Sequence, residues 1–413
     1  MKKTGWMLGL LLCLFCLCGM AEEEVVIVHA TDMHYLSPTL TDGGDHFMAA
    51  IASADGKVTH YTPEIMQAFV DEMLRMKPDA VVLSGDLTLN GAPQSHRELA
   101  ALLAPLQDAD IQVLVLPGNH DTGAAAYRFE GDGVTVVEGT LDGDFDDLYW
   151  ELGYENALSR DGASMSYAAR VAEDVWCLLV DTNANGTAGT VKDETLSWME
   201  EQMKMARDAG ATVIAVSHQP VLVHNELFTF GYVINNAGKV EKLYDAYEVK
   251  INLCGHLHMQ HVEQKGLLTE ICASSLAVSP NQFGVLKIAD GQIGEYAMQA
   301  LDVDAWAEKT GQADENLLHF TAYSAAFFDG TTRGQLAAAL AETGASEAGQ
   351  QCMMDFALRL NREYFAGRRT LTKEDAGWLL WQRHMESAFF SRYMQSILDE
   401  EMQDMTQVDF TAN

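Results

Sequence analysis

Basic residues are scarce in this chain, which has 26 lysines and arginines against 60 aspartates and glutamates in 413 residues. The formal net charge is therefore −34 at neutral pH. Proteins bind long nucleic acids by neutralising phosphates with lysine and arginine, so a surface this acidic argues against long DNA or RNA as a partner. A small phosphorylated molecule is still allowed as a ligand, because a bound metal ion reverses the local electrostatic field.

Cysteine is also sparse beyond the first twenty residues, where only Cys177, Cys254, Cys272 and Cys352 occur. Their wide spacing shows neither a disulfide framework nor a CxxC metal knuckle, so we expect buried free thiols. The chain is 48% hydrophobic and 21% charged. That balance excludes bulk disorder and allows a sizeable core.

The first 21 residues are predicted to be a signal peptide rather than part of the fold. Two lysines precede an apolar run over residues 6–20, and Gly19 and Ala21 are small residues at the two positions that determine cleavage. We expect cleavage after Ala21, a secreted or cell-surface protein, and no transmembrane segment in the mature chain. Bulky residues stand directly before Cys16 and Cys18, which disfavours a lipid anchor because lipid-modified cysteines follow small residues.

Residues 22–300 alternate between strand-like and helix-like patterns, which predicts an α/β domain. Apolar runs without polar alternation suit strands that are covered on both faces. Residues 301–413 show helical patterns without strands and predict a smaller all-α C-terminal domain. The segment 122–164, rich in glycine and aspartate, predicts loops or a lid. The strand-like runs cover residues 25–28, 80–83, 111–116, 175–180, 212–216 and 249–253.

Polar side chains follow five of these strands directly. The carboxyl ends of strands in α/β sheets form binding crevices, so residues at these ends are expected to meet. Glycines at 85, 118 and 255 allow the tight turns that direct the next side chain into the crevice. In chain order the residues are Asp32 and His34, then Asp86, then Asn119, His120 and Asp121, then His218, and finally His256 and His258.

Most of these residues are of the types that bind metal ions. Seven potential ligands are too many for one four-coordinate ion and suit two divalent or trivalent ions that share a carboxylate. Mixed oxygen and nitrogen donors favour manganese, iron or zinc over calcium, which prefers oxygen alone. The predicted ligands are Asp32, His34, Asp86, Asn119, His218, His256 and His258.

The order of these motifs, DxH, GD, GNHD, HxP and GHxH over residues 25–288, resembles the calcineurin-like metallophosphoesterase superfamily. The resemblance implies a two-sheet αββα sandwich. Residues 31–35, 84–91 and 95–98 are similar to a bacterial branch, the class III cyclic-nucleotide phosphodiesterases. Some members of that branch carry a C-terminal helical domain, which the region from residue 301 would match.

The resemblance also implies a role for each residue. Asp32, His34, Asp86 and His258 would hold one metal ion. Asp86 would bridge to a second ion, which Asn119, His218 and His256 complete. His120 would face the substrate, and Asp121 would orient its ring. Gln219 departs from the family pattern, in which a second histidine often follows the ligand, so we expect altered contacts around the site there.

These roles predict a secreted phosphodiesterase that acts on a small phosphodiester such as a cyclic nucleotide. Two ions roughly 3.5–4 Å apart would clamp the attacking and leaving oxygens and make a bridging hydroxide available near neutral pH. His120, held as imidazolium, would protonate the leaving oxygen. A phosphomonoesterase or a nucleotide or lipid-sugar pyrophosphatase are the alternatives within this class. A non-catalytic cell-wall module that binds metal or phosphate is the alternative of another class.

Two further residues have weaker signals. Asn90 is a candidate for binding the substrate phosphate, although Asn90-Gly91 is also an ordinary turn sequence. His96 lies beside Ser95 in the first turn of a predicted helix, so we expect its side chain to be exposed.

Overall fold

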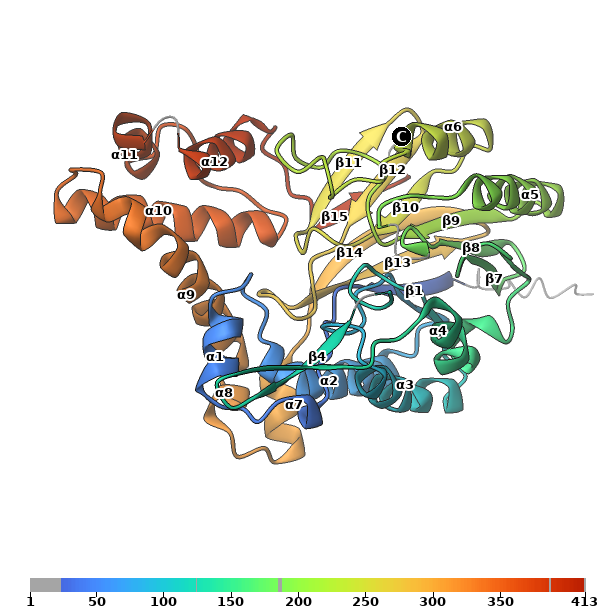
Figure 1. Cartoon of the computed structure of the whole chain (residues 1–413). Helices are drawn as coiled ribbons and strands as arrows, with labels where there is room; N and C mark the ends of the chain where they lie inside the picture. The colour runs from blue at the N-terminus through green and yellow to red at the C-terminus, as the bar shows by residue number, and fades with distance from the viewer. Residues whose placement is uncertain (1–23, 124, 185–187, 386–387, 412–413) are drawn as a thin grey trace, which may run out of the picture.

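The computed structural model describes residues 24–411 apart from residues 124, 185–187 and 386–387. The predicted signal peptide, residues 1–21, lies outside the described residues. Two stacked β-sheets form the centre of the molecule, and a group of helices extends to one side (Figure 1). Among the described helices, none is long and apolar enough to cross a lipid bilayer.

The first sheet has six strands, in the order β15-β14-β13-β1-β2-β3. Parallel pairing joins β1, β2 and β3, and β13 runs antiparallel to β1. Strand β2 is buried along its whole length, as expected for an unbroken apolar run. The bounds are β1 Glu24–Ala30, β2 Ala80–Leu83, β3 Gln112–Val115, β13 Gln282–Ala289, β14 Gln292–Ala300 and β15 Gln407–Asp409.

The second sheet has seven strands, in the order β11-β12-β10-β9-β8-β7-β6. Its centre, β8-β9-β10-β12, is parallel, and its edges are antiparallel. The bounds are β6 Ser159–Arg160, β7 Tyr167–Ala172, β8 Val175–Val180, β9 Thr212–Ser217, β10 Ile251–Cys254, β11 His261–Lys265 and β12 Leu268–Cys272. A separate hairpin joins β4, Ala126–Glu130, to β5, Gly133–Val137.

Alternate residues of β8 explain the layering. Cys177 and Leu179 lie in the large core between the sheets, whereas Leu178 and Val180 pack under the helices that cover the second sheet. Those helices are α5, Asp193–Ala209, and α6, Ala237–Ala246. The first sheet is covered by α2, Thr62–Met76, and α3, Pro93–Asp108. The α/β fold of two sheets between helices is confirmed.

The segment 122–164, predicted as loops or a lid, contains regular secondary structure. Besides the β4–β5 hairpin, residues 122–164 form α4, Asp142–Leu148, and the π-helix η3, Trp150–Tyr154. Tyr149 and Tyr154 from this segment are fully or almost fully buried. Short elements also precede α2: η1 Pro38–Leu40, α1 Asp45–Ala52 and η2 Thr59–Tyr61.

The C-terminal region is helical from residue 303 to residue 399, and its own apolar core includes Met353, Trp378 and Trp381. The last residues depart from the predicted helical domain, because β15 pairs antiparallel with β14 and returns the chain to the first sheet. The helices are α7 Val303–Thr310, α8 Glu315–Leu318, α9 Phe320–Ala341, α10 Glu347–Phe365, α11 Ala376–Met385 and α12 Phe389–Asp399.

Candidate active site

The residues predicted at five strand ends meet at one edge of the two sheets. β1, β2 and β3 carry their residues from the first sheet, and β9 and β10 carry theirs from the second. Backbone hydrogen bonds fasten the loops together, since Asp32 N donates to Gly85 O at 3.0 Å and His34 N donates to Asp86 O at 3.0 Å. Gly255 N donates to His218 O at 3.0 Å and joins the two loops of the second sheet.

One group of potential ligand atoms comprises Asp32, His34, Asp86 and His258, all within 4.8 Å of one another. Nε2 of His34 lies 3.0 Å from Nε2 of His258, and that nitrogen of His258 lies 3.3 Å from Oδ1 of Asp32. Two imidazole nitrogens and a carboxylate oxygen therefore point at the same small volume. This is the arrangement that a shared cation would stabilise.

A second group comprises Asp86, His218 and His256, again within 4.8 Å. Nε2 of His218 is 3.3 Å from Oδ1 of Asp86 and 3.1 Å from Oδ1 of Asn119. Asp86 belongs to both groups, so its carboxylate lies between them. All seven residues predicted as ligands are thus brought together, in the two sets that the resemblance implied.

The second nitrogen of each of two imidazoles is held by a backbone carbonyl. Nδ1 of His218 lies 2.9 Å from Ser84 O, and Nε2 of His256 lies 3.0 Å from Gly231 O. Such contacts fix the ring orientation and leave the other nitrogen for a ligand.

The charges of the site favour a cation. Burial alone would raise the pKa of Asp86, but the neighbouring His218 and His120 hold that pKa well below its ordinary value. Burial lowers the pKa of His34, and burial together with His218 lowers the pKa of His256 to about 4. Burial would also lower the pKa of His218, but the Asp86 carboxylate raises it to about 9. The ionised Asp86 carboxylate and the neutral imidazoles of His34 and His256 are in the forms that bind metal ions, and an ion bound at His218 would displace the proton that Asp86 stabilises there.

One buried atom of the first group shows what the side chains alone leave unsatisfied. Oδ1 of Asp32 accepts no hydrogen bond among the described residues, although it lies 3.3 Å from Nε2 of His258. An unpaired buried polar atom costs roughly 1–3 kcal/mol, so such atoms are rare unless a ligand or water pairs with them. Carboxylate, amide and imidazole donors together suit manganese, iron or zinc. The residues therefore fit two metal ions.

The backbone around the site is strained. Asp32, His34, Asp86, His256 and His258 have positive φ angles between 45° and 70°, and they are half of the ten described non-glycine residues with positive φ. Each such residue costs on the order of 1 kcal/mol and persists only where the surrounding structure holds it, most often at functional sites.

Two glycines are required here by close approach. A Cβ atom at Gly118 would lie 2.2 Å from Asp86 N, and one at Gly255 would lie 1.9 Å from Thr31 Oγ1. Any side chain at either position would push apart the loops that carry the candidate ligands.

His120 is placed beside both groups, and its side chain is 39% exposed. Its Nε2 lies 4.0 Å from Oδ2 of Asp86, and its ring is 5.0 Å from the ring of His34. Its Nδ1 lies 2.8 Å from Leu89 O, so the ring donates to that carbonyl and keeps Nε2 directed at the site.

The prediction that Asp121 orients the His120 ring is wrong, because the described hydrogen bonds of the Asp121 carboxylate go to other groups. The Asp121 carboxylate accepts hydrogen bonds from the backbone N–H groups of Leu87, Thr88 and Gly118, at 2.8–3.0 Å. It also accepts one from the Thr88 hydroxyl. Consecutive side chains of a turn point in different directions, so Asp121 faces the interior and ties together the loops after β2 and β3.

Replacing Asp121 with alanine is therefore expected to lower the free energy of unfolding by roughly 3 kcal/mol or more, because three backbone donors lose their acceptor. Urea denaturation measures this loss. Asp79→Ala is the matched control, since Asp79 accepts one backbone N–H, from Val26. A loss no larger than that of the control would contradict the assigned role.

Of the two weaker candidates, the structure contradicts the expectation for His96, and that for Asn90 stays a prediction. Nδ2 of Asn90 donates to Tyr127 O at 2.8 Å, which leaves its other amide atom, the buried Oδ1, without a partner among the described residues. The predicted exposure of His96 is wrong, because its ring is fully buried between Tyr149 OH and Asp121 O. The helix α3 begins at Pro93, which turns His96 toward the segment that contains η3.

Gln219 and Asp55 complete the surroundings. The Gln219 amide donates to Oδ1 of Asn183 and accepts from the hydroxyl of Thr182, neither of which is a candidate ligand. Asp55 was not predicted, yet its Oδ2 lies 3.7 Å from Nδ1 of His258 and 3.0 Å from Nζ of Lys57. It lies in a turn after α1 with no motif around it, so nothing in the sequence marks it.

Comparison with known proteins agrees with this geometry. Residues 25–260 match the family model described as calcineurin-like phosphoesterase, over more than half of the chain. Residues 302–404 match the model described as the C-terminal domain of cyclic nucleotide phosphodiesterase.

Among curated relatives, a cAMP/cGMP dual specificity phosphodiesterase of Mycobacterium tuberculosis is 22% identical over 57% of this chain and 63% of the relative. A 3′,5′-cyclic-nucleotide phosphodiesterase of Nostoc sp. is 26% identical over 47% of this chain and 61% of the relative. A glycerophosphodiester phosphodiesterase of Enterobacter lignolyticus is 26% identical over 45% of this chain and 58% of the relative. The matches thus span about three fifths of each relative.

Proposed function

Because the chain belongs to the calcineurin-like phosphoesterase family, we propose that it is a phosphodiesterase that cuts a small phosphodiester, such as a cyclic nucleotide, with two metal ions. One observation carries the proposal: two groups of ligand atoms share the carboxylate of Asp86. The relatives named as phosphodiesterases support a diester as the substrate.

Each residue has a task in this proposal. Asp32, His34, Asp86 and His258 would hold one ion, and Asp86, Asn119, His218 and His256 would hold the other. Two cations held there would lower the pKa of a water molecule and attract the negative charge that spreads over the phosphoryl oxygens. The carbonyls of Ser84 and Gly231 keep two of the imidazoles in position.

His120 would handle the proton of the leaving group. Its Nδ1–H donates to Leu89 O, so a proton on Nε2 faces the site from its exposed side. Donating that proton to the departing alkoxide is general acid catalysis.

The proposal also includes export of the protein. Cleavage after Ala21 would make Glu22 the first residue of a mature secreted or cell-surface chain. N-terminal sequencing of protein recovered from the cell exterior tests this part independently of the chemistry.

The test of function compares hydrolysis of bis(p-nitrophenyl) phosphate with that of p-nitrophenyl phosphate in the presence of Mn²⁺. We expect faster turnover of the diester, and equal turnover in His319→Ala, whose imidazole is exposed and distant in sequence from the site. Preference for the monoester would favour a phosphomonoesterase instead. Bound metal with turnover of neither compound would favour a non-catalytic binding module.

A further inference from the structure

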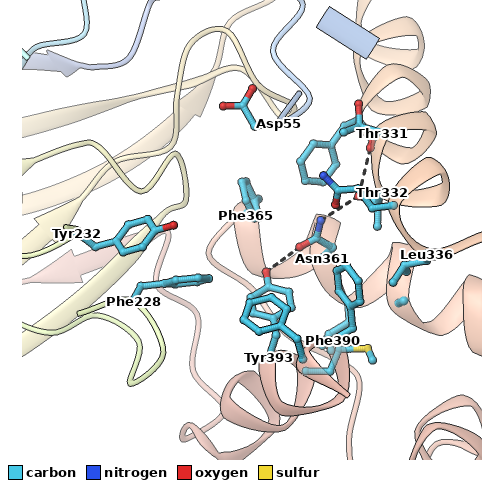
Figure 2. A pocket seen from close by; sticks show the side chains of 16 residues that line it. Asp55, Phe228, Tyr232, Thr331, Thr332, Leu336, Asn361, Phe365, Phe390 and Tyr393 are labelled. Carbon is cyan, nitrogen blue, oxygen red and sulfur yellow. Dashed lines mark hydrogen bonds between the residues drawn. The ribbon is translucent and has the colours of Figure 1, made fainter. Parts of the chain in front are cut away.

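A cavity of about 350 Å³ lies where the C-terminal helices face the loop that follows β9. Phe228 and Tyr232 come from that loop, and Phe365, Phe390 and Tyr393 come from α10 and α12. Figure 2 shows the two loop rings on one side of the cavity and the helical rings on the other. Seven of the sixteen residues that line it are aromatic.

One end of this pocket adjoins the candidate active site. Asp55 lines the pocket, and its Oδ2 also lies 3.7 Å from Nδ1 of His258. Tyr232 lines it as well, and the Tyr232 ring centroid is 5.9 Å from that of His256. A molecule whose phosphate lies at the imidazoles can therefore extend past Asp55 into the pocket.

The polar groups of the pocket are uncharged except for Asp55, among the described residues that line it. Tyr393 OH donates to Oδ1 of Asn361 at 2.8 Å, and Nδ2 of Asn361 donates to the Thr332 hydroxyl at 3.1 Å (Figure 2). One N–H of the Asn361 amide remains available at a fixed position. An alkyl chain would bury this N–H without a partner, whereas a heteroaromatic ring offers an edge atom that accepts from it and a face that stacks on aromatic side chains.

We propose that this pocket binds a planar heteroaromatic ring, such as a nucleobase, carried by the phosphoester, and that the helical region thereby selects the substrate. The proposal rests on the proposed function for the position of the phosphate. Along this path the base would lie in the aromatic pocket, the sugar beside Asp55 and the phosphate at the imidazoles. The sugar is placed beside Asp55 because a carboxylate accepts hydrogen bonds from sugar hydroxyls.

The test replaces Phe390 with alanine and, to keep apolar volume, with leucine. Phe390 is half-buried on α12 and lines the pocket. Phe230→Ala is the matched control, because Phe230 lies in the same loop as Tyr232 but is 92% exposed. Steady-state hydrolysis is measured with 3′,5′-cyclic AMP and with glycerophosphoethanolamine, which lacks a ring. Calorimetry measures the binding of adenosine, which lacks the phosphate.

Loss of one stacking ring is expected to raise KM for cyclic AMP and Kd for adenosine about tenfold in both Phe390 variants. Values for glycerophosphoethanolamine, and all values for Phe230→Ala, should stay within twofold of wild type. Equal effects on both diesters, or none on either, would overturn the pocket assignment while diester hydrolysis stands. Adenosine binding weakened by the Phe390 variants without hydrolysis of any diester would support the pocket and overturn the proposed function.

Discussion

Asp86→Ala is expected to lower kcat/KM for phosphodiester hydrolysis by about 10³-fold or more. The Asp86 carboxylate is the one side chain common to both groups of candidate ligands in the described residues. Its removal takes a charged ligand from each proposed ion and leaves His218 without the carboxylate 3.3 Å away. A loss of about 10³-fold corresponds to roughly 4 kcal/mol of transition-state stabilisation, a reasonable share for metal-assisted chemistry.

Metal content identifies the cause of that loss. Inductively coupled plasma mass spectrometry after dialysis should find about two ions in the wild type and fewer in Asp86→Ala. Asp86→Asn keeps an oxygen that can accept the His120 backbone N–H, now bonded at 2.8 Å, so its fold should be preserved while activity is lost. Asp181→Asn is the control, because Asp181 is also buried at a strand end but lies outside both groups. Retention of two ions by Asp86→Ala would contradict the assignment of Asp86 as a ligand shared by both ions.

The strand ends could be predicted because two independent signals coincide there. Strands such as β2 are unbroken apolar runs, and in the turns after β2, β3 and β10 a glycine stands directly before the polar residue. Gly118 and Gly255 cannot carry a Cβ atom, so the glycines before Asn119 and His256 are a requirement of the close packing. Sequence spacing then selects side chains that the structure places together, even though they come from two different sheets.

Contacts that depend on side-chain direction could not be predicted in the same way. Asp121 is adjacent to His120 in sequence, but its carboxylate faces the backbone of Leu87 and Thr88. His96 is buried because Tyr149, in a segment with weak periodicity, packs over it. Strand β15 depends on pairing with β14, more than a hundred residues away, and three residues carry too little pattern to predict that.

His120→Ala should separate proton donation from metal binding through the choice of leaving group. An alkoxide must be protonated as it leaves, so removal of the imidazole should lower kcat for glycerophosphoethanolamine or cyclic AMP about 10²–10⁴-fold. A p-nitrophenolate leaves readily without a proton, and kcat for bis(p-nitrophenyl) phosphate should fall far less. Metal content should equal that of the wild type, because His120 belongs to neither group of candidate ligands.

The comparison with Asp121→Ala makes this prediction specific. Asp121 supports the loops after β2 and β3 through backbone contacts, so its loss should slow both kinds of substrate by a similar factor. His120→Ala should instead change the ratio of the two rates. A structural role for the His120 ring, through its bond to Leu89 O, would give the same uniform factor as Asp121→Ala. An unchanged ratio would therefore show that His120 takes no part in the reaction and that solvent protonates the leaving group.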